Sequence, residues 1–468
     1  MIAPNAKTAL NILIPLGLVA ALGCSNPDTA STEDPVVPTN PTVEVSEAAE
    51  RYVHLVLAVG QHDGDYVDAY HGPAEWREAA EAAQRPLADI RAEARDLVDA
   101  LAQGPASDDA MRELRRRFLG RQLESLVGRV DLLDGKAMTF DEESQVLYDA
   151  VAPNHPTEHY QGILEGLDQQ LAAEGFTDGS FLERYNAFRS HFVIPPDKLD
   201  AVFQAAIDAC RERTAPWIEL PPDESFVVEY VNDKPWSGYN WYQGDFKSLI
   251  QVNTDLPIYI DRAIDLACHE GYPGHHVYNV LLEKHLRRDR GWIEFSVYPL
   301  FSPQSLIAEG SANYGIDMAF PGDERIAFEK EVLFPLAGLD PAKAEGYYRV
   351  QEEQRLLGYA GNEAARRYLD GEIDAEAAAE WLTQYAASEP ARAAQRVRFF
   401  DTYRSYVINY NLGQDLVADW VERQAGDAPA DRWRVFGQLL SSPRLPSDLM
   451  LDPGSAESTP SADGSTDE

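Results

Sequence analysis

Apolar residues recur at helical spacing through most of the chain, three and four positions apart on one face of each helix. The clearest cases are residues 114–133, 199–213, 263–286, 345–369 and 391–410. Two shorter segments, residues 225–230 and 246–254, carry the β-branched and aromatic side chains that are typical of strands. The pattern predicts a mainly α fold with a small β-sheet beside the helix at 263–286.

The helical pattern continues from residue 46 to residue 451 without a break that reads as a linker. Prolines fall between helical stretches, at positions where they mark turns rather than domain borders. We therefore expect one large helical domain over residues 46–451. Residues 452–468 are rich in Ser, Asp and Glu, which predicts a disordered acidic tail.

Residues 1–23 have the pattern of a secretion signal. A single lysine, Lys7, precedes an apolar run from Leu10 to Leu22, which is too short for a comfortable membrane span. Residues 24–45 are rich in Pro, Thr, Asp and Ser, a composition that predicts a disordered tether.

The end of this signal, Ala-Leu-Gly-Cys at residues 21–24, resembles the lipobox of bacterial lipoproteins. The resemblance implies cleavage before Cys24, lipidation of that cysteine and an envelope lipoprotein, periplasmic or anchored to the outer membrane. Ser25 favours the outer membrane by the same analogy. An ordinary cleaved signal with a chance cysteine remains the alternative.

The other two cysteines, Cys210 and Cys268, allow at most one bridge. We expect them to be two buried thiols.

The chain carries a formal charge of −38, from 78 acidic and 40 basic residues. This excess repels nucleic acid and anionic lipid surfaces, so neither is expected as a partner. A solvating acidic surface accounts for the charge, and a preference for cationic substrates is the lesser alternative.

The run His-Glu-Gly-Tyr-Pro-Gly-His-His at residues 269–276 has the residue types of a stretched zinc-peptidase motif. In ordinary zinc peptidases two histidines four apart on a helix bind the metal, and a glutamate between them acts as base. On an unbroken helix the sixth position lies on another face, and the seventh lies about 10 Å further along the axis.

Pro273 and Gly274 can remove this mismatch, because proline lacks an amide hydrogen and glycine tolerates unusual backbone angles. If the dipeptide bulges out of the helix, His275 takes the place of the fourth-position ligand. We therefore expect His269 and His275 as metal ligands. His276 remains the alternative ligand, or a group that contacts the substrate.

Two histidines need a third protein ligand to hold a catalytic zinc. The best candidate is Glu309, at the start of a predicted helix after Pro303. The small residues Gly310, Ser311 and Ala312 follow it and leave room for close packing against the histidine-bearing helix.

In this set Glu270 would be the general base on a metal-activated water. Tyr406 and Tyr410 could donate a hydrogen bond to the developing oxyanion, although aromatic residues at helical spacing are also common in cores. Arg404 could bind a substrate carboxylate, and Tyr242 belongs to an aromatic cluster on the approach to the motif. The strand at 246–254 could pair with an extended peptide along its edge.

The string His-Glu-x-x-Pro-Gly-His-His, with the later Glu-Gly-x-Ala at residues 309–312, resembles the bacterial DUF885 family, which is similar to the gluzincin metallopeptidases. The resemblance extends to Asp-Ala-Tyr-His-Gly-Pro at residues 68–73 and Tyr-Val-Ile-Asn-Tyr at 406–410. It implies a mostly helical, gluzincin-like fold with a deep cleft and a zinc-dependent, peptidase-like site. The chain departs from the family at Ser311, where many relatives carry Trp.

These residues together predict a zinc-dependent hydrolase of peptide or small amide substrates. Two other functions stay open: a non-catalytic envelope protein that keeps the metal site for binding or assembly, and a hydrolase of esters or modified amides. The sequence leaves the oligomeric state and the preferred substrate undetermined.

Overall fold

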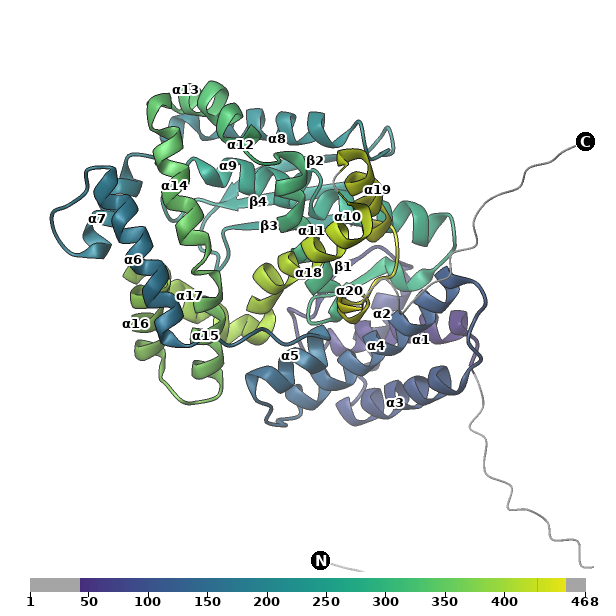
Figure 1. Ribbon diagram of the computed structural model, residues 1–468. Helices are drawn as coiled ribbons and strands as arrows, with labels where there is room; N and C mark the ends of the chain where they lie inside the picture. The colour runs from purple at the N-terminus through teal and green to yellow at the C-terminus, as the bar shows by residue number, and fades with distance from the viewer. Residues whose placement is uncertain (1–42, 427, 452–468) are drawn as a thin grey trace, which may run out of the picture. The chain divides into compact units, whose positions relative to one another are not determined.

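The computed structural model describes residues 43–426 and 428–451, which fall in one compact unit beginning at Pro41 (Figure 1). Helices dominate it, with two short β-sheets, so the predicted mainly α class is confirmed. No described helix is long and apolar enough to cross a membrane. The expected signal peptide, Cys24, most of the tether and the acidic tail lie outside these residues.

The first five helices pack around an apolar cluster that includes Leu55, Leu123 and Phe140, with α3 lying along α4. Polar caps start two of these helices: Asp109 accepts from the amide of Arg112, and Thr139 forms a capping box with Glu142. The helices are α1 (Val45–Val59), α2 (Ala74–Ala83), α3 (Leu87–Gln103), α4 (Ala110–Leu133) and α5 (Phe140–Tyr148).

A second and larger apolar cluster lies under the middle of the chain, where helix α14 packs along α6. Helix α15 packs along α16 and α16 along α17, and the buried residues of these three helices belong mainly to the first cluster. The stretch predicted as one helix at 345–369 is two helices, α14 and α15, separated at Leu356. The helices of this region are α6 (Thr157–Ala173), α7 (Phe181–Ser190), α8 (Leu199–Thr214), α12 (Glu324–Phe328), α13 (Phe334–Ala337), α14 (Ala344–Arg355), α15 (Gly358–Leu369), α16 (Ala375–Tyr385) and α17 (Pro390–Tyr403).

The larger sheet has the order β2-β4-β3, with β2 (Ser225–Val231) parallel to β4 (Lys247–Asn253) and β3 (Gly238–Gly244) antiparallel to it. The two strands predicted from sequence, β2 and β4, are confirmed. The third strand, β3, went unrecognised. Because β4 is central, both of its edges are already paired, and the idea that a peptide adds to it is wrong.

A separate two-stranded sheet joins β1 (Val67–Tyr70) to β5 (Val297–Pro299) in antiparallel register. It ties the N-terminal helices to the middle of the chain, since β1 follows α1 and also contacts β3. Asp68 therefore lies near residues that are some 200 positions later in the sequence.

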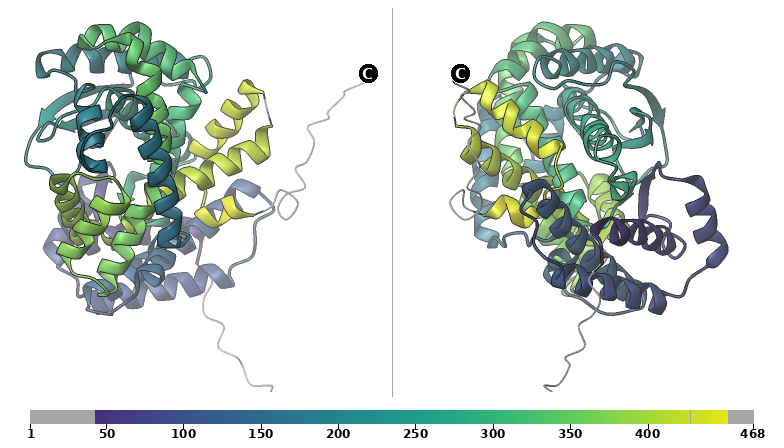
Figure 2. Two further views of the ribbon diagram at one scale, coloured as in Figure 1. Left: turned by 60° about the vertical axis from the view of Figure 1, so that its left-hand side comes forward. Right: turned by 90° about the vertical axis from the view of Figure 1, so that its right-hand side faces the viewer.

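Helices α11 (Pro303–Ala319) and α18 (Ile408–Ala425) cross in close contact. At the crossing, a Cβ on Gly310 would lie 2.3 Å from the carbonyl oxygen of Gly413, so only glycine fits there. The small residues after Glu309 thus serve mainly the contact with α18. Helices α19 (Pro429–Leu440) and α20 (Pro446–Met450) then pack back against α18, in yellow in Figure 2.

The helix predicted at 263–286 is broken where the sequence places Pro273 and Gly274. It comprises α9 (Asp261–Leu266), the π-helical turn η2 (Ala267–Gly271), α10 (His275–Leu281) and the π-helical η3 (Leu282–Arg288). A Cβ on Gly274 would lie 1.8 Å from the carbonyl oxygen of His269, so the chain turns back on itself at a glycine. The larger sheet lies beside this broken helix, as predicted, through contacts of β3 with η2 and α10.

Cys210 and Cys268 form a disulfide bond, so the expectation of two buried thiols is wrong. Helix α8 packs against η2 and brings the two Cα atoms to 5.5 Å, within the range of a bridge. The signal sequence expected at residues 1–23 pointed to this outcome, because exported proteins pass into compartments where disulfides persist.

Candidate metal centre

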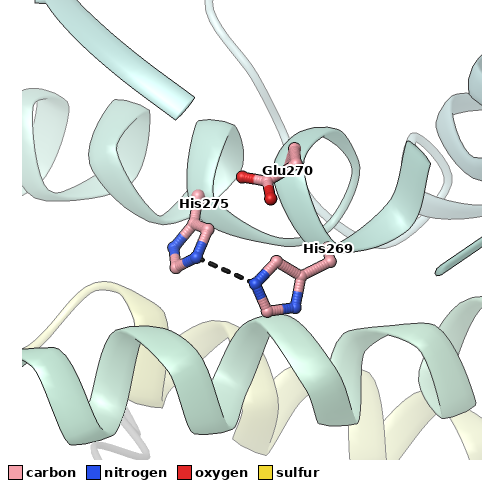
Figure 3. A group of neighbouring side chains, drawn as sticks. All are labelled: His269, Glu270 and His275. Carbon is pink, nitrogen blue, oxygen red and sulfur yellow. Dashed lines mark hydrogen bonds between the residues drawn. The ribbon is translucent and has the colours of Figure 1, made fainter. Parts of the chain in front are cut away.

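Three side chains, one each from η2, α10 and α11, converge at the break in the histidine-bearing helix. The Nε2 atoms of His269 and His275 lie 3.1 Å apart. Oε2 of Glu309, on α11, lies 3.2 Å from the first and 3.6 Å from the second. Figure 3 shows the two imidazoles facing each other, with the carboxylate of Glu270 beside them.

The distances between these three atoms fit a tetrahedral zinc ion. With metal–ligand bonds of about 2.0–2.1 Å, neighbouring ligand atoms of a tetrahedral ion lie about 3.3–3.4 Å apart. The observed 3.1, 3.2 and 3.6 Å lie around that value. Oε2 of Glu309 is also buried and accepts no hydrogen bond among the described residues. The donor set of two imidazole nitrogens and one carboxylate oxygen therefore suits zinc and leaves a fourth position open.

Hydrogen bonds behind the ligands fix their orientation. Nδ1 of His269 lies 2.8 Å from Oδ1 of Asn313, so this nitrogen carries the proton and Nε2 is free to bind a metal. Asn313 in turn donates to the backbone oxygen of Tyr410 at 2.8 Å. The hydroxyl of Tyr406 donates to Oε1 of Glu309 at 2.7 Å.

Glu270 lies next to the three ligand atoms without being held by other side chains. Its backbone oxygen accepts a hydrogen bond from Asn240 of β3 at 2.7 Å, and no described residue donates to its carboxylate. Gly238 lies so close that a Cβ there would be 2.8 Å from Oε1 of Glu270. Burial raises the pKa of Glu270, and the imidazoles of His269 and His275 oppose that rise. The carboxylate is free to accept a proton.

The charges of the clustered side chains compensate one another. Burial disfavours a charged His275, yet the carboxylates of Glu309 and Glu270 outweigh it and raise the pKa of His275 to about 9. Burial alone would raise the pKa of Glu309, but the charges of His275 and His269 hold that pKa well below its usual range. A divalent cation would replace the charge of the His275 imidazolium as the positive charge of this site.

Asp68 belongs to the surroundings of this site, although sequence reasoning assigned it no role. It lies on β1, and the hydroxyl of Tyr239 donates to its carboxylate. Burial raises the pKa of Asp68 to about 6, against the opposing effects of that hydrogen bond and of the His275 charge. No spacing in the sequence could have found Asp68, because the contact spans two separate sheets.

Tyr410 and Arg396 face the cluster from the C-terminal part of the chain. The guanidinium of Arg396, on α17, lies 5.6 Å from the ring centre of Tyr410. Burial lowers the pKa of Arg396, while Tyr410 and Glu309 act in the opposite sense. Among the described residues, no carboxylate pairs with this guanidinium. Arg396 rather than Arg404 is therefore the arginine that faces the candidate metal ligands.

Three residues of the predicted site lie away from the ligand cluster. His276 is fully buried and binds Ser248 and Glu224, each at 2.8 Å, because consecutive residues of α10 point in different directions. Arg404 pairs with Glu143 at 2.7 Å. Tyr242 donates to the buried carboxylate of Glu283. The lipidation site Cys24 lies outside the described residues.

Comparisons with known proteins add little to this geometry. No family model matches the chain, and no curated protein matches it. A solved structure described as that of a "putative lipoprotein" from Colwellia psychrerythraea aligns with a TM-score of 0.48 at 16% identity. The alignment covers 88% of this chain and 76% of that one.

Proposed function

We propose that the protein is a zinc-dependent hydrolase of peptide or related amide bonds, with His269, His275 and Glu309 as the metal ligands. The observation that carries the proposal is the triangle of ligand atoms, with sides of 3.1, 3.2 and 3.6 Å. Two imidazoles and one carboxylate at these distances leave one position for water or substrate, which is the arrangement of a catalytic rather than a structural zinc.

The residues around the ligands have the properties that hydrolysis requires. Zinc, when bound, would polarise the substrate carbonyl and lower the pKa of a water molecule. Glu270 takes the proton of the attacking water and returns it to the leaving nitrogen. The hydroxyl of Tyr410 donates to the carbonyl oxygen as negative charge develops there. Arg396 adds a positive charge over the ring of that tyrosine, 5.6 Å from the ring centre.

The cellular location that we propose is the envelope, with the chain attached through a lipid on Cys24. Support comes from the predicted signal sequence and from the disulfide between Cys210 and Cys268, because disulfides persist in oxidising compartments.

Metal analysis and one substitution test the proposed function. We expect one zinc per chain after purification in zinc-containing buffer. We expect Glu270→Gln to keep that zinc and to lose hydrolysis of a peptide library by about 10³-fold or more in kcat, because the water then lacks its base. His269→Ala should lose the metal, whereas His191→Ala, which changes an exposed histidine, should keep it.

Two results would reject the proposal: a wild-type protein that takes up no zinc, or a Glu270→Gln variant with full activity. A zinc-loaded wild type that cleaves no peptide, amide or ester would instead favour a non-catalytic binding protein. The library should include ester substrates, since the same residues can attack either carbonyl.

A further inference from the structure

Three arginines line a cavity of about 70 Å³ beside the sheet. They are Arg189 on α7, Arg262 on α9 and Arg392 on α17, and they meet the side chains of Trp236 and Gln395 there. Such a gathering stands out in a chain with 78 acidic and only 40 basic residues. The cavity has several times the volume that one water molecule needs.

Two of these arginines have no carboxylate partner among the described residues. Arg189 stacks over the ring of Tyr259 at 3.8 Å, and its Nε atom is buried without a hydrogen bond. Arg392 donates to the backbone oxygen of Pro257 at 2.8 Å. Burial lowers the pKa of Arg392, and the nearby charge of Arg189 lowers it further. Two positive charges are therefore held close together. Glu389 acts electrostatically on Arg392 and Asp261 on Arg189, but neither carboxylate forms an ion pair with them among the described residues.

The nearby carboxylates are largely engaged elsewhere. Asp265 binds Arg262 and Arg325, each at 2.8 Å. Asp261 accepts hydrogen bonds from Tyr347 at 2.6 Å and from Gln351 at 3.0 Å. These contacts leave the guanidinium groups of Arg189 and Arg392 available to a ligand.

The cavity adjoins the candidate metal centre. Leu266 lines it, and a Cβ on Gly238 would lie 2.7 Å from Leu266 and 2.8 Å from the carboxylate of Glu270. On α17, Arg392 and Gln395 face the cavity, and Arg396, one turn after Arg392, faces Tyr410. One face of α17 thus connects the cavity with the surroundings of the metal ligands.

We propose that this cavity binds the side-chain carboxylate of an acidic residue in the substrate. Guanidinium groups bind carboxylates through paired, charge-assisted hydrogen bonds. The apolar side chains of Leu256 and Pro257, which also line the cavity, suit the methylene groups of a glutamate side chain. The proposal rests on the proposed hydrolase function and names its substrate class: peptides with an acidic residue next to the bond that is cleaved.

A binding experiment tests the cavity without any hydrolysis. Calorimetry would compare N-acetylglutamate methylamide with N-acetylglutamine methylamide on the metal-free full chain, since the two probes differ only in the carboxylate. We expect the glutamate probe to bind at least tenfold more tightly. Arg392→Gln should weaken its binding at least tenfold, Arg392→Lys should restore part of the loss, and Arg398→Gln, on an exposed part of α17, should change nothing.

Thermal unfolding of each variant would show that it is folded. Equal affinity for the two probes, or equal effects of Arg392→Gln and Arg398→Gln, would overturn the proposal. Tighter binding of inorganic phosphate than of the glutamate probe would also overturn the proposal, because the cavity would then be a site for a free anion.

An activity experiment separates this inference from the function on which it rests. Matched peptides with Glu or Gln at one position would be compared by kcat/KM, and we expect wild-type protein to prefer Glu at least tenfold. Arg392→Gln should lose the preference, whereas Arg398→Gln, on an exposed part of α17, should keep both the preference and the rate. If peptides are cleaved without a preference for Glu, the proposed carboxylate site is wrong. If the glutamate probe binds but no peptide is cleaved, the proposed hydrolase function is wrong.

Discussion

The carboxylate of Glu309 uses its two oxygens for different tasks. Oε1 accepts the hydroxyl of Tyr406 at 2.7 Å, while Oε2 faces His269 and His275. A hydrogen bond to one oxygen fixes the direction of the other, so the ligand is oriented before a metal arrives. Tyr406 is buried, which keeps water from competing for that contact.

Tyr406→Phe tests this role. Because the substitution removes only the hydroxyl that orients Glu309, we expect zinc affinity to fall about 10- to 100-fold. Competition with a chromophoric chelator measures it. Tyr368→Phe is the matched control, since it removes a hydroxyl bonded to the carboxylate of Asp401 on the surface. Equal zinc affinity in both variants would contradict the orienting role.

Tyr410 has a different role in the proposed mechanism, because its hydroxyl would contact the reacting carbonyl rather than a ligand. We expect Tyr410→Phe to lower kcat about 100-fold at saturating zinc, with zinc affinity unchanged. Steady-state kinetics on metal-loaded protein provide the measurement. If Tyr410→Phe weakened only zinc binding, Tyr410 would support the metal site and would take no part in the reaction.

At the scale of elements, the site depends on one interruption of a helix. The π-helical turn η2 ends at Gly271, and the chain then folds back so that the amide of Gly274 donates to the carbonyl oxygen of Cys268 at 2.9 Å. Helix α10 restarts at His275. The imidazoles of His269 and His275, six positions apart, thereby come together, whereas an unbroken helix would place them on different faces.

Gly274→Ala should disrupt this interruption. An added Cβ would meet the carbonyl oxygen of His269 at 1.8 Å, a backbone contact that only a shift of the ligand can relieve. We expect a loss of about 3 kcal/mol in the free energy of unfolding and at least tenfold weaker zinc binding. Gly162→Ala, on α6 with open space around it, should stabilise by about 0.5–1 kcal/mol. Urea titrations that give similar values for both variants would refute this account.

Sequence patterns predicted the elements well where the signal is local. The two apolar strands and the break at Pro273 and Gly274 follow from side-chain spacing and backbone chemistry alone. Strand β3 went unrecognised because its aromatic residues read as a cluster, although Asn240 and Tyr242 are buried and Trp241 between them is exposed. Hydrophobic periodicity could not have identified this strand, because the polar Asn240 is the buried residue and the aromatic Trp241 is the exposed one.

The parts of the site that escaped prediction depend on contacts between distant segments. Asp68 reaches the site through the pairing of β1 with β5, and Arg396 through the packing of α17 near Tyr410. Arg396 and Arg404 look equivalent in sequence, and only the fold shows that Glu143 already neutralises Arg404. Which residues become partners across such long separations in sequence depends on the tertiary structure.

At the scale of the whole molecule, buried charges away from the site make stability depend on pH. Glu329, at the start of the π-helical η5 (Glu329–Leu333), is fully buried, and the hydroxyl of Tyr348 and the guanidinium of Arg325 both bind its Oε1 atom. Burial raises the pKa of Glu329 to about 7, despite the opposing charge of Arg325. The folded chain therefore holds this proton more tightly than the unfolded chain does.

A raised folded-state pKa gives stability at low pH that is lost as the pH rises. The contribution of Glu329 should be complete below about pH 4.5 and disappear as the pH passes 7, a change of about 3 kcal/mol. Glu329→Gln imitates the protonated form at every pH. In urea unfolding we expect the variant to match wild type at pH 5 and to exceed it at pH 8. The same difference at both pH values would contradict this assignment.

The position of Tyr406, 97 residues after the Glu309 that it holds, has a consequence for the synthesis of the chain. The chain must be made through residue 406 before the turn that carries Tyr406 can close over α11. Until then the nascent chain has its histidines and Glu309 but no group to orient the carboxylate. The order of the sequence thus makes the oriented carboxylate of Glu309 a late product of synthesis, which forms only after the segment that carries Tyr406 has been made.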